Sequence, residues 1–258
     1  MFKALVIFLI AIVLGITTIT DGYTLQLSGG VEKLSKMASQ VTDGDSPISG
    51  AEVSIPSYDF DTTTSSSGRF EIPKNFVPPY ILTVKKAGYD PFSLTITSTN
   101  KPFKIELTKN SQNKLIIEDN TYHIGDDSFS ENSANARDFR MQSIGVEYTK
   151  HFFVKQIPSN QNIFLKIGSI IGLDTKEAKR LGQNKVSFAY SSPAQVLINS
   201  KAIGKLKING DNQKIKIPSH VLLPNTENSI TIISGTNQKQ SDEDYDDFEF
   251  SNIILEYN

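Results

Sequence analysis

The fold is decided by residues 41–107, which read VTDGDSPISGAEVSIPSYDFDTTTSSSGRFEIPKNFVPPYILTVKKAGYDPFSLTITSTNKPFKIEL. Along this stretch, apolar side chains alternate with polar ones in short runs, as expected for strands with one wet face. The alternating apolar positions are Val53 and Ile55, Phe70 and Ile72, Leu82 and Val84, Leu94 and Ile96, and Phe103, Ile105 and Leu107. Turn formers such as Gly50, Gly68, Gly88 and Pro91 separate the runs. Short strands with frequent turns predict an all-β sandwich.

The same stretch resembles a known family. Its motifs are V-T-D at 41–43, P-I-S-G-A-E-V at 47–53, T-T-T-S-S-S-G-R-F-E-I-P at 62–73 and L-T-V-K-K-A-G-Y at 82–89. Together they resemble the carboxypeptidase regulatory-like, transthyretin-like domain. The resemblance implies a small β-sandwich over residues 39–110 that acts as a spacer or folding support. It does not extend to a zinc peptidase, because no histidine of this chain begins an H-x-x-E motif.

The N-terminus has the pattern of a secretory signal. A basic residue, Lys3, precedes an apolar run from Ala4 to Ile16, which is short compared with the roughly 20 residues of a membrane span. We therefore predict a signal peptide over residues 1–20, a linker over 21–38, and a secreted, periplasmic or cell-surface protein without a stable membrane span. The alternative is an uncleaved anchor or a buried helix.

Composition excludes several classes of function. The chain has 258 residues and a formal net charge of −2, so it has no global attraction to nucleic acid, and no nucleic-acid partner is expected. It has no cysteine, which rules out disulfides, thiolate chemistry and a lipoprotein anchor on this chain. It also lacks tryptophan, the residue that sugar-binding platforms often use.

Alternating runs continue through the second half, with one helix predicted over residues 174–181. The predicted strands are 114–118, 142–149, 152–156, 163–170, 186–190, 194–199, 214–217, 229–233 and 248–257. Such a series is typical of a two-sheet sandwich. The runs at 196–206, 217–232 and 245–253 are also similar to galactose-binding-like and carbohydrate-binding jelly rolls. This resemblance implies a larger jelly-roll sandwich over residues 112–258.

Six carboxylates gather between residues 242 and 249, with no basic residue among them. Hard cations prefer several oxygen ligands, so this acidic run is a candidate calcium site. We predict a structural calcium held by Asp244, Asp246 and Asp247, with Glu118 as a partner by analogy with the resembled jelly rolls. The spacing is not that of an EF-hand. The alternative is a solvated acidic loop that keeps the last strand soluble.

A second polar segment, residues 122–132, is predicted to be a long loop. Sugar sites combine aromatic faces with carboxylates and amides. The candidate ligand contacts are therefore Tyr122, Asp126, Asp127, Phe129 and Asn132. The alternative is that the two aromatic residues fix the loop to the core while the acids face water.

No catalytic motif is visible, because the chain lacks G-x-S-x-G and phosphate-binding glycine patterns. We therefore predict an exported, non-catalytic protein that binds carbohydrate or a cell-surface polymer through its jelly roll. The alternative is a structural or protein-interaction component of the cell envelope, with an envelope protein as partner. A hydrolase with paired carboxylates is a third interpretation.

Overall fold

The computed structural model describes residues 39–44, 46–98, 102–128, 139–157, 161–184, 190–237 and 244–258. In these residues the chain is almost entirely β, with a single α-helix, α2 (Lys176–Arg180). The all-β prediction is therefore confirmed. The predicted signal peptide and linker, and the candidate contacts Phe129 and Asn132, lie outside the described residues. None of the helices described has the length and apolar character needed to cross a membrane.

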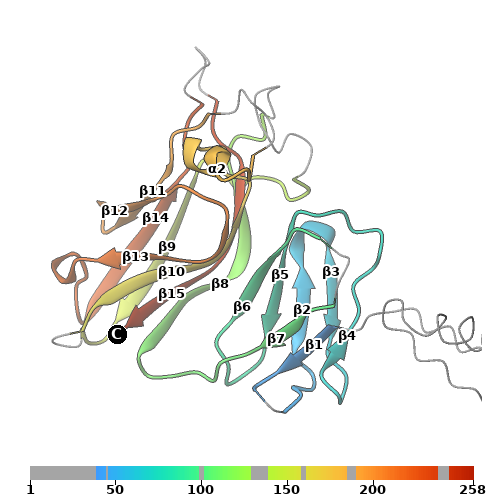
Figure 1. The fold of residues 1–258 in the computed structure, drawn as a ribbon. Coiled ribbons are helices and arrows are strands. Elements are labelled where there is room, and N and C mark those ends of the chain that lie inside the picture. Colours follow the sequence, from blue (N-terminus) through green and yellow to red (C-terminus); the bar gives the residue numbers. More distant parts are fainter. Residues whose placement is uncertain are drawn as a thin grey trace, which may run out of the picture.

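The first half forms a sandwich of two sheets (Figure 1). Its smaller sheet has the order β4-β1-β7, and β1 pairs in parallel with β7. Its larger sheet has the order β3-β2-β5-β6 and is antiparallel. The strands are β1 (Ser39–Thr42), β2 (Glu52–Ile55), β3 (Phe60–Thr63), β4 (Arg69–Phe70), β5 (Tyr80–Lys85), β6 (Phe92–Ile96) and β7 (Lys104–Glu106), with the 3-10 turn η1 (Pro56–Tyr58) after β2. Val53, Leu82 and Ile105 are buried in its core, as the alternation predicted.

The second half is an eight-stranded jelly roll with its own core. Its sheets have the orders β13-β10-β15-β8 and β12-β11-β14-β9. Counted from β8, these orders are 6-3-8-1 and 5-4-7-2, the strand order of two interleaved Greek keys. The strands are β8 (Lys114–Ile124), β9 (Glu147–Val154), β10 (Ile163–Ile171), β11 (Ala194–Ile198), β12 (Lys201–Leu206), β13 (Gly210–Ile217), β14 (Thr226–Ile233) and β15 (Phe248–Tyr257), with the 3-10 turn η2 (Ser219–Val221) before β14.

The strands differ from the predicted ones in several details, two of which concern β8 and β9. Strand β8 continues to Ile124, so the loop predicted from residue 122 begins only after that residue. The register of β8 against β15 shifts around Ile253, where a bulge interrupts the two-residue alternation that the sequence would show. Strand β9 is one continuous element where the sequence predicted separate runs at 142–149 and 152–156.

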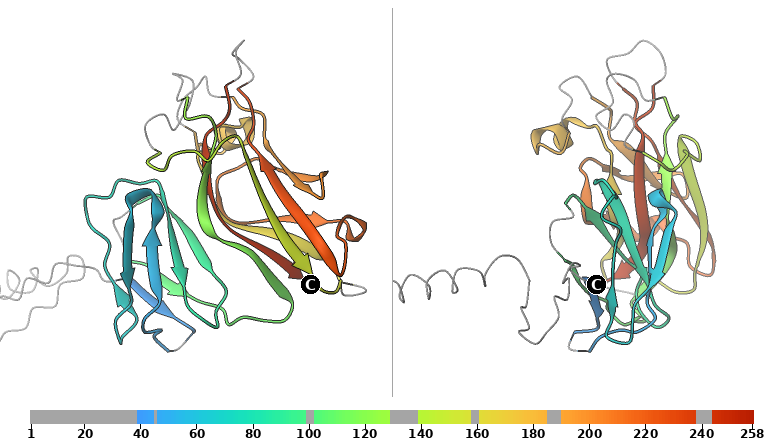
Figure 2. Two further views of the ribbon diagram at one scale, coloured as in Figure 1. Left: turned by 180° about the vertical axis from the view of Figure 1, so that it is seen from behind. Right: turned by 90° about the vertical axis from the view of Figure 1, so that its right-hand side faces the viewer.

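The two sandwiches pack against each other through the sheet that contains β15 (Figures 1 and 2). All ten residues of β15 are buried, because one face of the strand lies in the jelly-roll core and the other faces the first sandwich. The contact is also polar: Asp211 Oδ1 accepts hydrogen bonds from Thr95 N and Thr95 Oγ1, both at 2.9 Å. Gly168 permits the close approach, since a Cβ there would lie 2.3 Å from Ser93 Oγ. The first sandwich is therefore fixed to the jelly roll along a shared face.

Candidate functional site

Three of the four connections at one end of the jelly roll form the candidate site. They join β8 to β9, β10 to β11 and β14 to β15. Ser191 of the second connection pairs with Asn237 of the third, while Thr175 pairs with Ser191 and Thr236 with Tyr245 within one connection each. We call this the loop end, meaning residues 125–128, 139–146, 172–184, 190–193, 234–237 and 244–247. It lies at the top of the jelly roll in Figure 1.

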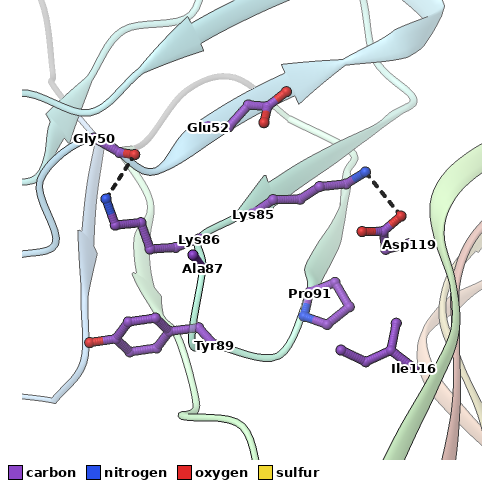
Figure 3. Close-up of a pocket in the computed structure, with 9 residues that line it drawn as sticks. All are labelled: Gly50, Glu52, Lys85, Lys86, Ala87, Tyr89, Pro91, Ile116 and Asp119. Carbon is purple, nitrogen blue, oxygen red and sulfur yellow. Dashed lines mark hydrogen bonds and ion pairs between the residues drawn. The ribbon is translucent and has the colours of Figure 1, made fainter.

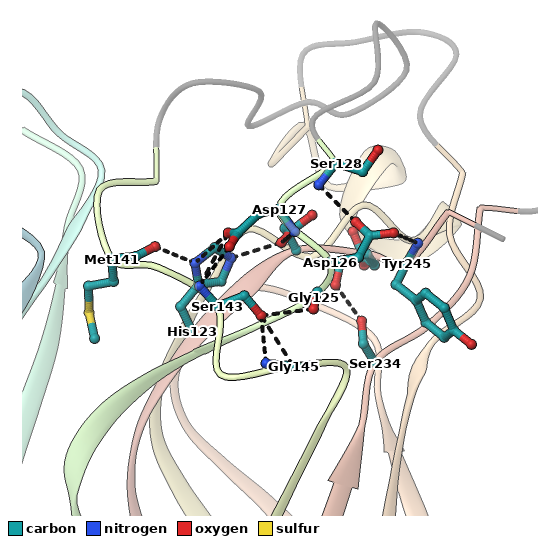
Figure 4. Close-up of polar contacts among 12 residues, drawn as sticks. His123, Gly125, Asp126, Asp127, Ser128, Met141, Ser143, Gly145, Ser234 and Tyr245 are labelled. Carbon is teal, nitrogen blue, oxygen red and sulfur yellow. Dashed lines mark hydrogen bonds and ion pairs between the residues drawn. The ribbon is translucent and has the colours of Figure 1, made fainter.

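Aspartates fasten these stems together (Figure 4). Asp126 Oδ2 accepts a hydrogen bond from the backbone N–H of Tyr245 at 3.1 Å. Asp246 Oδ2 accepts from the backbone N–H of Asp174, and Asp247 Oδ1 accepts from that of Asp127, each at 3.1 Å. Each hydrogen bond joins two different connections, so the three carboxylates hold the stems of the loops together.

The acidic run is therefore not a solvated loop in its described part. Asp244, Asp246, Asp247 and Glu249 are between 1% and 7% exposed. Burial and the nearby charge of Asp174 raise the pKa of Asp246 well above its usual range. The remaining members of the run, Asp242 and Glu243, lie outside the described residues.

His123, at the end of β8, contacts both Asp247 and the segment that precedes β9. Its Nδ1 lies 2.6 Å from the carbonyl oxygen of Met141, and its Nε2 lies 3.0 Å from Asp247 Oδ1. A carbonyl can only accept, so Nδ1 carries a proton and donates it. Burial acts to lower the pKa of His123, but the Asp247 and Met141 contacts outweigh it and raise that pKa. The ring of Phe139 stacks on the imidazole with centroids 4.6 Å apart.

Gly125 makes room for this arrangement. Its φ is +151°, and a Cβ on it would lie 2.0 Å from Asp247 Oδ1. Any other residue there would displace the carboxylate that binds His123. The local sequence His123-Ile124-Gly125 thus supplies a buried imidazole, a core residue and the space for the carboxylate of Asp247, which immediately precedes β15.

Glu249 is the direct cross-strand neighbour of His123 in the β8–β15 pairing. It is 1% exposed, and its Oε2 has no hydrogen-bond partner among the described residues. Burial raises the pKa of Glu249 to about 7, although the charges of His123 and Arg140 act in the opposite direction. The Arg140 guanidinium also lies 4.2 Å over the ring of Tyr58, which connects the loop end to the first sandwich.

Glu118 is not part of the loop end. It lies on β8 opposite Ile253, about six residues along β15 from Asp247, which is roughly 20 Å in a strand. The structure therefore brings Asp244, Asp246 and Asp247 to one end of the jelly roll but separates them from Glu118. One calcium ion cannot contact all four predicted ligands.

Glu118 instead joins the edges of the two sheets. Its carboxylate accepts hydrogen bonds from Tyr148 Oη at 2.8 Å and from Tyr122 Oη and Lys150 Nζ, both at 3.0 Å. Burial acts to raise the pKa of Glu118, but these donors and the backbone of Asn120 outweigh it and lower that pKa to about 2.

The candidate ligand contacts are separated in the same way. Tyr122 packs against Tyr148 and Phe250 in the wall of the sandwich. Asp126 and Asp127 lie at the loop end, where Asp127 also accepts from the backbone N–H of Ser143. Sequence reasoning missed His123 and Tyr245. Neither has a local signal, because their partners lie more than a hundred residues away in the chain.

A shallow hollow lies between the sandwiches, away from the loop end (Figure 3). Its volume is about 390 Å³, and residues from β2, β5 and β8 line it. Lys85 Nζ lies 3.3 Å from Asp119 Oδ1, and Lys86 Nζ donates to the carbonyl of Gly50 at 3.1 Å. Its two lysines already bind protein acceptors, so the hollow is a weaker candidate for ligand binding than the loop end.

Comparison with known proteins agrees with the first sandwich. Residues 39–120 match the family model described as the CarboxypepD_reg-like domain. No curated protein matches the chain. Among solved structures, a β-D-glucuronidase of Dictyoglomus thermophilum is 14% identical, with a TM-score of 0.31, over 58% of this chain and 29% of that enzyme. The alignment thus spans less than a third of the enzyme, and a TM-score this low defines neither a shared fold nor a shared activity.

Proposed function

We propose that this protein is an exported, non-catalytic recognition protein whose jelly roll binds a carbohydrate or cell-surface polymer at the loop end. One observation carries the proposal: the stems of three connections are fastened to one another by Asp126, Asp246 and Asp247, of which the last two are buried. Loops held on a rigid base are a common position for binding residues.

The described chemistry of the loop end suits polar ligands with apolar faces. Tyr245 is half-buried, and its ring points away from the aspartates in Figure 4. An aromatic face of this kind can stack on the C–H bonds of a sugar, while carboxylates and amides bind the hydroxyls. Asp126, Asp246 and Asp247 each use an oxygen to bind a backbone N–H, which supports a positioning role for them rather than acid–base catalysis.

The test is binding of the full chain to a glycan array and to insoluble cell-surface polysaccharides. Wild type, Tyr245→Ala and Phe153→Ala would be compared, since Phe153 is 56% exposed on β9 and lies outside the loop end. We expect Tyr245→Ala to weaken binding by about tenfold or more, and Phe153→Ala to bind as wild type does. A folded wild type that binds no glycan or polymer would refute the proposal, as would loss of binding in Phe153→Ala alone.

A second candidate function is a structural or protein-interaction component of the envelope. It is favoured by the shared face of the two sandwiches, because a strand buried on both sides makes the pair one extended body. A null result on every glycan, together with isolation of a defined envelope complex that contains this chain, would favour this function over the first.

A further inference from the structure

We propose that His123, Asp127 and Asp247, with Glu249 beside them, form a binding site for one divalent transition-metal cation such as Zn²⁺. This inference does not depend on the recognition function proposed above. It rests on the positions of the four side chains, on the tautomer of His123 and on an oxygen of Glu249 that has no hydrogen-bond partner in the described part of the chain.

The donor atoms are already close enough to share an ion. One ligand atom from each of His123, Asp127 and Asp247 lies within 4.8 Å of the other two. His123 Nε2 and Asp247 Oδ1 are 3.0 Å apart. Two donors that each lie about 2.1 Å from one Zn²⁺ are separated by roughly 3.0–3.4 Å, so this pair fits an ion with little movement.

The imidazole is held in the orientation that a metal ligand requires. His123 Nδ1 donates its proton to the Met141 carbonyl at 2.6 Å, which directs Nε2 toward Asp247. Metal-ligating histidines usually donate their other ring N–H to a carbonyl or carboxylate in this way. The stacked ring of Phe139 further restricts the imidazole.

Glu249 supplies the second, independent observation. It lies directly across the strand pair from His123, so the two side chains project to the same face of the sheet, and Asp247 immediately precedes this strand. It is 1% exposed, and its Oε2 has no hydrogen-bond partner among the described residues. A buried carboxylate oxygen without a donor is costly, and a cation beside His123 would give it a partner.

The donor set selects the class of metal. Calcium and magnesium prefer oxygen ligands alone, whereas an imidazole nitrogen suits zinc and other first-row transition metals. The proposed site, built around His123 with nitrogen and oxygen ligands, differs in its donor set from the calcium site expected from the acidic run. Two of its acids, Asp247 and Glu249, come from that run, but the histidine comes from the far end of β8.

The test is isothermal titration of the full-length, tag-free protein with zinc chloride, with calcium chloride as the second probe. We expect one zinc per chain and no calcium binding of comparable affinity. His123→Gln should weaken zinc binding by about 100-fold, and Glu249→Gln by about tenfold. His151→Gln and His220→Gln are matched controls, because both histidines lie on β9 or η2, away from the site, and are exposed. Both controls should bind zinc as wild type does.

A measurement on wild type keeps the proposal testable if His123→Gln does not fold. Nitrogen-15 NMR of the imidazoles should show zinc shifting Nε2 of His123 while Nδ1 retains its proton. No zinc binding by wild type, unchanged binding in a folded His123→Gln variant, or a zinc-dependent shift at His151 or His220 instead of His123 would overturn the proposal.

Discussion

Glu118 and Glu249 lie on the neighbouring strands β8 and β15 and are both almost inaccessible to water, yet their surroundings are opposite. Glu118 is 3% exposed and accepts hydrogen bonds from two tyrosines, a lysine and local amides. Glu249 is 1% exposed and has an oxygen without a partner among the described residues. The pKa of Glu118 is lowered to about 2, and that of Glu249 is raised to about 7.

The difference teaches that burial alone does not decide what a carboxylate does. Donors that favour the charged form can outweigh the cost of burial, and without them the neutral form is favoured. At the sheet edge, the carboxylate of Glu118 accepts hydrogen bonds from side chains of β8 and β9 and so links the two strands. At the loop end, the acids are numerous and incompletely neutralised, which is the condition in which a bound cation or ligand lowers the free energy.

The largest expected effect on stability is at Glu118, the carboxylate with several hydrogen-bond donors. Glu118→Ala removes the acceptor shared by Tyr122, Tyr148 and Lys150, and should lower the free energy of unfolding by about 3–5 kcal/mol. Urea unfolding measures this. The matched control is Glu227→Ala, since Glu227 is 70% exposed on β14 and its removal should change stability by less than about 0.5 kcal/mol. Equal effects of the two substitutions would contradict the account.

The two carboxylates should also give opposite pH dependences. The folded-state pKa of Glu118 is below its ordinary value of 4.5, so its contribution is present above pH 4.5 and is lost as pH falls toward 2. The folded-state pKa of Glu249 is above 4.5, so its contribution is present below pH 4.5 and is lost as pH rises to about 7. For Glu249 the loss is roughly 3 kcal/mol.

Glu249→Gln isolates this second effect, because an amide does not ionise. Relative to wild type, the variant should gain stability between pH 5 and pH 8 by roughly 2–3 kcal/mol, with metal removed by a chelator. Urea unfolding of both proteins across this range gives the difference directly. A difference that does not change with pH would show that Glu249 titrates normally in the folded state.

A smaller effect is expected at the shared face of the sandwiches. Asp211→Ala removes the acceptor for both groups of Thr95 and for Ser169, and should cost about 2 kcal/mol. Hydrogen exchange at the Thr95 amide should also become faster. Asp211→Asn keeps an acceptor oxygen and should lose less than half as much. If exchange at Thr95 is unchanged in the alanine variant, the contact does not hold the sandwiches together.

The smallest effect is expected beside the hollow. Lys85 and Asp119 are 31% and 46% exposed, so their ion pair is screened by water. Lys85→Ala should change the free energy of unfolding by less than about 0.5 kcal/mol in urea titrations. A loss of 2 kcal/mol or more would mean that this surface pair contributes as much as the buried contact at Asp211.

The sequence predicts much of the framework and little of the site. Alternation identified the sandwich strands and the all-β class, because a half-buried strand imposes a period of two. It missed β12, whose residues Lys201–Leu206 include lysines and a glycine at exposed or half-exposed positions. It also ended β8 early, at the bulge near Glu118, because a bulge interrupts the alternation on which the prediction depends.

At the loop end, the sequence indicated the acidic residues but not their partners. Asp247 meets His123, and Asp246 meets Asp174, only because β15 returns between β8 and β10. These contacts depend on the order of the strands in the sheet, and the alternation of apolar and polar residues along one segment does not reveal that order. The same reason explains why Glu118 was grouped with aspartates that lie at the other end of its strand pair.

The central claim is that, among the described residues, Glu249 next to the loop end is a buried carboxyl group that lacks hydrogen-bond donors, whereas Glu118 at the sheet edge is fully hydrogen-bonded. Carbon-13 NMR of the glutamate carboxyl groups across a pH titration of the metal-free protein measures it directly. The account predicts that Glu249 titrates near pH 7 and that Glu118 stays ionised down to about pH 2. Titration of both groups close to 4.5 would contradict it.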